Sequence, residues 1–181
     1  MPALLEASNR YRLFFGPSRA LRALCRAYAV VMKPSWRFWT VLAVLILDRL
    51  TKLWAIHWLK PIAYVPVFRF FHLTYVENTG AAFGIGVHRN GFFIALSGVL
   101  LCVLLYLARA WSRKSLWLQA GVLLVAGGAL GNLYDRIVYG CVVDFLDFRV
   151  WPVFNVADSC VTVGACCLAW GMRAEDRKNG R

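Results

Sequence analysis

The sequence carries little charge, and acidic residues are the scarcest. Of its 181 residues 17% are charged and only 9 are Asp or Glu, whereas 60% are hydrophobic. A soluble domain of this size would expose too much apolar surface at that composition. The composition therefore argues against an ordinary soluble protein and indicates a chain that lies in a membrane.

Several short motifs of metal and hydrolase chemistry are also missing. The 6 cysteines include no Cys-x-x-Cys pair, which argues against a disulfide framework or a zinc site. The 3 histidines form no His-Glu-x-x-His motif, which argues against a zinc protease of membranes. The absence of Gly-x-Ser-x-Gly argues against the serine nucleophile that this motif carries. We therefore expect no metal and no cofactor.

The net charge of +12 comes mostly from the two ends of the chain. Such a charge could indicate nucleic acid, but basic ends on an apolar chain are explained more simply by a cytoplasmic membrane face. We expect no nucleic-acid partner. Residues 1–35 are predicted to be a basic cytoplasmic extension, either an interfacial amphipathic helix or a segment upstream of a natural start at Met32. Residues 173–181 are predicted to be a basic cytoplasmic tail.

Four apolar stretches are long enough for membrane-spanning helices, each of which needs about 20 mostly apolar residues. They lie near residues 39–58, 91–108, 116–133 and 153–172. Basic residues concentrate in both tails and between the second and third stretches, so the positive-inside rule places both termini in the cytoplasm. The two remaining loops then lie outside.

The first outer loop contains strand-forming sequence. Residues 62–67 and 68–76 are rich in aromatic and β-branched side chains, and prolines limit them to short or edge strands. The tripeptide at 78–80 is typical of a turn. The predicted fold is an all-α membrane protein with four transmembrane helices and a small extracytoplasmic β-sheet. Residues 145–154 are predicted to be an apolar outer loop that rests on lipid.

Ionisable residues at membrane depth are costly, which makes them candidates for function. Asp48 and Lys52 lie four residues apart on one face of the first helix, where they would pair inside the bundle or steer a substrate. Small residues at Gly127, Gly128 and Gly131 would let helices approach closely. Four more carboxylates fall near the outer ends of the third and fourth helices: Asp135, Asp144, Asp147 and Asp158.

Two carboxylates in a partly dry site share a proton, so that one accepts a proton from water while the other donates to a carbonyl oxygen. This chemistry hydrolyses a peptide bond without a metal or a nucleophilic serine. The residues alone do not decide which two would act. Asp135 could be bound by the adjacent Arg136, Asp147 could lie in a loop that sees water, and clustered acids could instead bind or carry a cation.

Five motifs resemble those of lipoprotein signal peptidase, also called signal peptidase II. They are Asp48-Arg-Leu-Thr-Lys52, Asn78-Thr-Gly-Ala-Ala-Phe-Gly84, Gly131-Asn-Leu-Tyr-Asp-Arg136, Val143-Asp-Phe145 and Phe154-Asn-Val-Ala-Asp-Ser159. A single motif of this kind would be a weak indication. All of them in family order, spread over four helices, are highly specific.

The resemblance implies an aspartic endopeptidase of the bacterial inner membrane, which cuts signal peptides from diacylglyceryl-modified prolipoproteins just before the lipidated cysteine. By motif position it implies Asp144 and Asp158 as the catalytic pair, within a peptidase domain over residues 36–172. The residues that it implies around the substrate or bracing the site are Asp48, Lys52, Asn78, Asn132, Asp135, Arg136 and Asn155.

The resemblance also bears on partners and on the outer loop. It implies a small β-cradle against the membrane, contact with membrane lipid, and inhibition by globomycin-type peptides. The long basic extension over residues 1–35 departs from the family pattern. Because a small bundle with a complete site can work alone, we expect a monomer.

Overall fold

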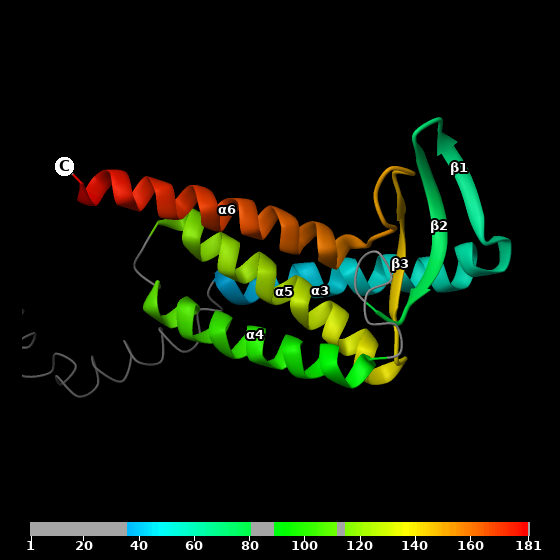
Figure 1. Cartoon of the computed structure of the whole chain (residues 1–181), viewed down its shortest axis with the longest axis horizontal. Helices are drawn as coiled ribbons and strands as arrows, with labels where there is room; N and C mark the ends of the chain where they lie inside the picture. The colour runs from blue at the N-terminus through cyan, green and yellow to red at the C-terminus, as the bar shows by residue number, and fades with distance from the viewer. Residues whose placement is uncertain (1–35, 81–88, 112–114, 181) are drawn as a thin grey trace, which may run out of the picture. The chain divides into compact units, whose positions relative to one another are not determined.

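The computed structural model describes residues 36–80, 89–111 and 115–180. These residues form four long helices and a three-stranded sheet (Figure 1). The helices are α3 (Trp36–Trp54), α4 (Asn90–Ala110), α5 (Leu116–Val138) and α6 (Val156–Asn179). Each overlaps one of the four predicted apolar stretches, although α5 and α6 continue beyond theirs. The expectations for residues 1–35 lie outside the described residues.

The helix α5 is the centre of the bundle and packs against α3, α4 and α6. Glycines bring α5 and α6 close together. A Cβ on Gly128 would lie 2.4 Å from the carbonyl oxygen of Ala157, and a Cβ on Gly121 would lie 2.8 Å from that of Gly164. The backbones can approach this closely only because these positions have no side chain, as the glycine-rich sequence predicted for Gly128.

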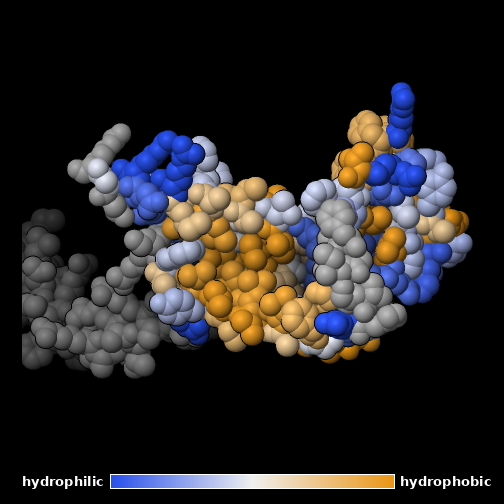
Figure 2. Space-filling model, viewed as in Figure 1, coloured by the Kyte–Doolittle hydropathy of each residue, from blue (hydrophilic) through white to orange (hydrophobic). Residues whose placement is uncertain are grey.

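Among the described helices, α4 and α5 are both long and apolar enough to cross a membrane. The helix α3 carries two buried charged residues, Asp48 and Lys52, and α6 has charged residues in its first and last turns. Figure 2 shows apolar surface over the bundle, with hydrophilic residues at the C-terminal end of α6 and on the sheet. Because α6 continues to Asn179, most of the predicted tail is helical.

The sheet is antiparallel and has the strand order β1-β2-β3. Strands β1 (Tyr64–Phe68) and β2 (Phe71–Asn78) come from the first predicted outer loop, as expected. Strand β3 (Val142–Asp147) overlaps the segment that was interpreted as an apolar loop, so that part of the prediction is wrong. Since five of its six residues are buried, β3 lacks the apolar and polar alternation that marks a half-exposed strand.

Packing between β3 and the end of α3 fixes the sheet to the bundle. The π-helix Ala55–Leu59 continues α3, and its buried Ala55 and Leu59 pack against Val143 and Phe145 of β3. In the β2–β3 register, Asn78 lies opposite Val142. Asn78 is therefore the last residue of a strand, and of the predicted turn only Thr79 and Gly80, where the chain bends, lie outside it.

Candidate active site

Asp144 lies on β3 and is bound by amide groups from two other segments. Its side chain is buried, and its Oδ1 accepts a hydrogen bond from Asn155 Nδ2 at 2.6 Å. Its Oδ2 accepts from Asn78 Nδ2 at 3.0 Å. Burial, together with the charge of Asp158, raises the pKa of Asp144 to about 7, although both amides favour its ionised form. Asp144 can therefore hold a proton close to neutral pH.

Asp158 lies in the first turn of α6, where it forms a capping box with Asn155. The Asn155 side chain accepts from the Asp158 N–H at 2.9 Å, and Asp158 Oδ2 accepts from the Asn155 N–H at 3.2 Å. A second donor to the carboxylate comes from α5, because Asn132 Nδ2 donates to Asp158 Oδ1 at 2.7 Å. A carboxylate in this position is also favoured by the dipole of the helix.

Asn155 connects the two carboxylates. Its side-chain amide donates to Asp144 and its backbone N–H donates to Asp158. The side chain is fully buried, and its Nδ2 also lies 3.2 Å from Asn132 Oδ1. The structure thus brings Asp144 and Asp158 into hydrogen bonds with one asparagine. Capping of α6 therefore accounts for only part of the contacts of Asn155.

A buried ion network lies behind Asn132. Lys52 Nζ is 2.8 Å from Asp48 Oδ2 and 2.9 Å from Asp135 Oδ2, and it donates to Asn132 Oδ1 at 2.8 Å. Asp48 Oδ1 accepts from the Ala157 N–H at 3.0 Å. The predicted pair of Asp48 and Lys52 inside the bundle is confirmed. It also bridges three helices, since its partners lie on α5 and at the start of α6.

Asp135 is bound from α3 and not by Arg136, its neighbour in the sequence. Its carboxylate is paired with Arg49 as well as with Lys52. Arg136 points elsewhere: it donates to the Gly80 carbonyl oxygen at 3.3 Å, and its guanidinium carbon lies 5.2 Å from the centre of the Phe93 ring. Consecutive residues of a helix do not share a face, so the suggested Asp135–Arg136 pair is not formed.

Asp147 does not lie in a loop that sees water. It is buried at the end of β3, where it accepts hydrogen bonds from Thr74 Oγ1 at 2.8 Å and from the Arg149 N–H at 2.7 Å. Burial opposes its ionisation, but these hydrogen bonds outweigh burial and hold the pKa of Asp147 below its usual value. Its partners belong to the sheet and the loop after it, apart from the Asp144 and Asp158 pair.

A cavity of about 330 Å³ opens beside Asp144 and Asp158. Asn78, Asn132 and Arg136 line its polar side. The segment between β3 and α6 supplies an apolar side, lined by Trp151, Pro152, Val153 and Phe154. Two carboxylates, amide donors and a cation therefore face a space bordered by apolar side chains, which suits an extended peptide with apolar residues.

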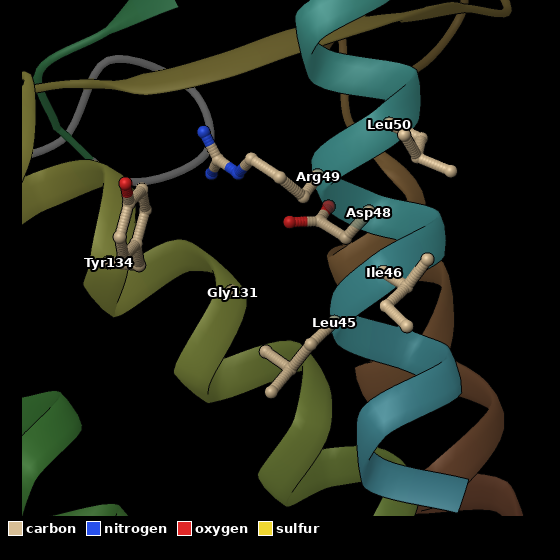
Figure 3. A pocket seen from close by; sticks show the side chains of 7 residues that line it. All are labelled: Leu45, Ile46, Asp48, Arg49, Leu50, Gly131 and Tyr134. Carbon is tan, nitrogen blue, oxygen red and sulfur yellow. The ribbon is translucent and has the colours of Figure 1, made fainter. Parts of the chain in front are cut away.

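A second groove, of about 420 Å³, lies between α3 and α5 next to the ion network. Figure 3 shows Arg49 reaching from α3 toward α5, where Tyr134 stands, and Asp48 turned toward Gly131. A Cβ on Gly131 would lie 2.6 Å from Asp48 Oδ2, so this glycine leaves room for the carboxylate. Arg49 lies inside a recognised motif, but nothing in the sequence indicates its partner on α5.

Comparison with known proteins points to one family. The profile described as "Signal peptidase (SPase) II" matches residues 40–173. A lipoprotein signal peptidase of Halothermothrix orenii is 48% identical over 130 residues, which are 71% of this chain and 88% of the relative. One of Caldanaerobacter subterraneus is 47% identical over 131 residues, which are 71% of this chain and 90% of the relative.

The fold has a solved counterpart. A structure described as a bacterial membrane enzyme, determined by the in meso method, superposes with a TM-score of 0.71 at 30% sequence identity. The match covers 82% of this chain and 93% of the other. These similarities favour a peptidase over the cation carrier that the clustered acids left open.

Proposed function

Because this chain belongs to the signal peptidase II family, whose members remove signal peptides from prolipoproteins, we propose that Asp144 and Asp158 are its catalytic pair. The contacts of Asn155 carry this proposal. One buried residue donates to both carboxylates, which line the same cavity. Two carboxylates held in this way can share one proton and hydrolyse a peptide bond as an aspartic peptidase does.

The surroundings of the two carboxylates favour Asp144 as the proton donor. Asp158, ionised at the start of α6, accepts a proton from the attacking water while the water oxygen bonds to the scissile carbonyl carbon. Asp144 gives its proton to the carbonyl oxygen. When the tetrahedral intermediate collapses, the C–N bond breaks and the leaving nitrogen takes the proton that Asp158 had accepted. As the carbonyl re-forms, one hydroxyl of the intermediate returns its proton to Asp144, so both carboxyl groups regain their starting states. The net reaction consumes one water and releases an acid and an amine.

The remaining predicted residues support this pair. Asn78 and Arg136 line the cavity and can hydrogen-bond the backbone of an extended substrate. Asn132 and Asn155 orient the two carboxylates, because each donates a side-chain hydrogen bond to one of them. The ion network of Asp48, Lys52 and Asp135 braces Asn132 from behind through Lys52.

The proposed substrate is a diacylglyceryl-modified prolipoprotein, cut just before its lipidated cysteine in the bacterial cytoplasmic membrane. All four helices would span that membrane, with both termini in the cytoplasm and the sheet outside. The apolar surface of the bundle and the basic residues near its ends support this arrangement. The site at the sheet-proximal end of the bundle would then meet a lipid-anchored bond at the outer boundary.

Cleavage by purified protein tests the proposal. We expect wild-type protein to cut a lipidated prolipoprotein, and Asp144→Asn and Asp158→Asn each to lower kcat by at least about 1000-fold while the variants stay folded. Glu77→Gln is the control, since this carboxylate lies on the outer sheet and pairs with exposed Lys60. A variant of either catalytic aspartate that retained a near wild-type rate would refute the assignment of that residue.

A further inference from the structure

The ion network contains an arginine, Arg49, to which the family resemblance assigns no role. Asp135 has no exposed side-chain surface, and two cations from α3 contact it: Lys52 at 2.9 Å and Arg49 through a hydrogen bond. Lys52 also binds Asp48, which is almost fully buried. With Arg49 included, the network has two positive and two negative charges. Without Arg49, a buried carboxylate would be left uncompensated, which is costly in an apolar interior.

Arg49 is the outermost member of the network. Its side chain is 24% exposed, whereas those of Lys52 and Asp135 are fully buried. Its guanidinium carbon lies 4.5 Å from the centre of the Tyr134 ring and 5.7 Å from that of Tyr139, and it donates to the Tyr139 hydroxyl at 3.5 Å. Figure 3 shows it beside the groove between α3 and α5. Both tyrosine rings therefore lie within cation–π distance of the guanidinium.

A chain of contacts joins Arg49 to the catalytic pair. Asp135 lies between Arg49 and Lys52, and Lys52 donates to Asn132 Oδ1 at 2.8 Å. Because Oδ1 of Asn132 accepts from Lys52, its Nδ2 is left to donate to Asp158 at 2.7 Å. The orientation of this amide therefore depends on Lys52 staying in place between two carboxylates.

We propose that Arg49 is a positioning residue for the hydrolytic reaction: it neutralises Asp135, so that Lys52 remains free to hold Asn132 against Asp158. This inference rests on the proposed function of Asp144 and Asp158. Loss of Arg49 would leave Asp135 with Lys52 as its sole cation among the described residues and draw Lys52 away from Asn132. It would also leave one uncompensated negative charge near the pair, which disfavours the loss of their shared proton.

The test uses the purified full-length protein, a lipidated prolipoprotein and a series of pH values. We expect Arg49→Gln to lower kcat about ten- to a hundredfold with little change in KM, because a small misplacement near the reacting groups is costly. We also expect the alkaline limb of its pH profile to move to higher pH. Arg49→Lys, which keeps the charge, should restore most of kcat and the wild-type profile. Arg69→Gln, in the exposed turn between β1 and β2, controls for loss of an arginine elsewhere.

A double variant that keeps the network neutral separates the effect of losing the Arg49 charge from the effect of losing its side-chain packing. Arg49→Gln with Asp135→Asn leaves one acid and one base in the network, so its alkaline limb should return toward the wild-type position. Unchanged kcat and pH profile in Arg49→Gln would overturn the inference, as would a double variant whose limb stays displaced. If Arg49→Gln does not fold, Arg49→Lys and the double variant are compared with wild type instead. Both should keep an alkaline limb close to the wild-type position, and a displaced limb in either would overturn the inference. Failure of the wild type to cleave would instead overturn the proposed function.

Discussion

Asp144 and Asp158 have different neighbours, and these neighbours assign them different roles in the proposed mechanism. Asp144 is buried on a strand, where neutral amides are its hydrogen-bond donors. Asp158 begins a helix and accepts from a backbone N–H and from Asn132. Both carboxylates accept only from neutral groups, but Asp144 is the more fully buried, which favours its protonated form, whereas the helix start favours the carboxylate of Asp158. The shared proton therefore belongs on Asp144.

Activity should depend on pH in a bell-shaped manner. The pKa of Asp144 is raised to about 7 by burial and by the charge of Asp158, so Asp144 loses its proton as the pH rises through that value. The rate should fall on this alkaline side, and on the acid side as Asp158 becomes protonated. Initial rates of lipoprotein cleavage at saturating substrate, from about pH 5 to 9, provide the measurement. A flat profile would contradict the shared proton.

The same pKa predicts an effect on stability with a definite sign. The pKa of Asp144 in the folded protein is about 7, above its ordinary value of 3.8, so the fold loses stability as the pH rises from about 3.8 to about 7, and the full loss persists above pH 7. Asp144→Asn should therefore raise the thermal midpoint in detergent by about 3 °C at pH 8, and by less at pH 5.

A residue on the same strand supplies a control of opposite sign. Hydrogen bonds from Thr74 and Arg149 outweigh burial and hold the pKa of Asp147 below its usual value, so ionised Asp147 stabilises the fold at pH 8. Asp147→Asn should lower the thermal midpoint under the conditions in which Asp144→Asn raises it. If both variants shifted the midpoint in the same direction at pH 8, the assignment of opposite effects would be wrong.

At the scale of the elements, the contact between α5 and α6 places Asn132 beside Asp158. This contact depends on Gly128, where a Cβ would lie 2.4 Å from the backbone oxygen of Ala157. Gly128→Ala should force the helices apart next to Asp158, lower the free energy of unfolding by about 1–3 kcal/mol and reduce the cleavage rate. Thermal unfolding in detergent and the lipoprotein assay measure the two effects.

A matched glycine tests whether that effect comes from the helix contact. Gly98 is also inside a helix, α4, but a Cβ there would meet nothing within 4 Å. Gly98→Ala should leave activity unchanged, and the better helix propensity of alanine should keep or raise stability. If Gly128→Ala and Gly98→Ala lost stability and activity equally, the effect at Gly128 would not come from the close approach of α5 and α6.

The helices could be predicted from the sequence because a run of about 20 mostly apolar residues by itself predicts a membrane-spanning helix. Strands β1 and β2 could be predicted because their residues are aromatic and β-branched. Strand β3 could not: it is nearly all buried, and it pairs with residues such as Asn78 and Val76 far earlier in the chain. The pairing partners of Asp135 and Asp147 were missed for the same reason, since Arg49 and Thr74 are distant in sequence.

At the scale of the whole molecule, the sheet and the C-terminal end of α6 lie at opposite ends of the described bundle (Figure 1). Under the proposed orientation, the sheet faces outward and the basic end of α6 faces the cytoplasm. Arg69 and Lys178, both exposed, mark these two ends. The proposal therefore predicts that a reagent which cannot cross the membrane distinguishes them.

Cysteine labelling in intact spheroplasts measures the orientation. Arg69→Cys should react with a membrane-impermeant maleimide, whereas Lys178→Cys should react only after the membrane is opened. The unsubstituted chain sets the background, because it has native cysteines such as Cys102 and Cys166 on the exposed surface of the helices. Labelling of Lys178→Cys in sealed spheroplasts, without labelling of Arg69→Cys, would reverse the proposed topology.

The scattered origin of the site has a consequence for the order of synthesis. Asn78 comes from β2, Asn132 from α5, Asp144 from β3, and Asp158 with its cap Asn155 from the start of α6. A ribosome delivers these pieces one after another, so no partly made chain that stops before α6 can hold both carboxylates. Under the proposed mechanism, the nascent peptidase is therefore inactive while its earlier apolar segments enter the membrane. It becomes able to hydrolyse peptide bonds only after α6 has been synthesised.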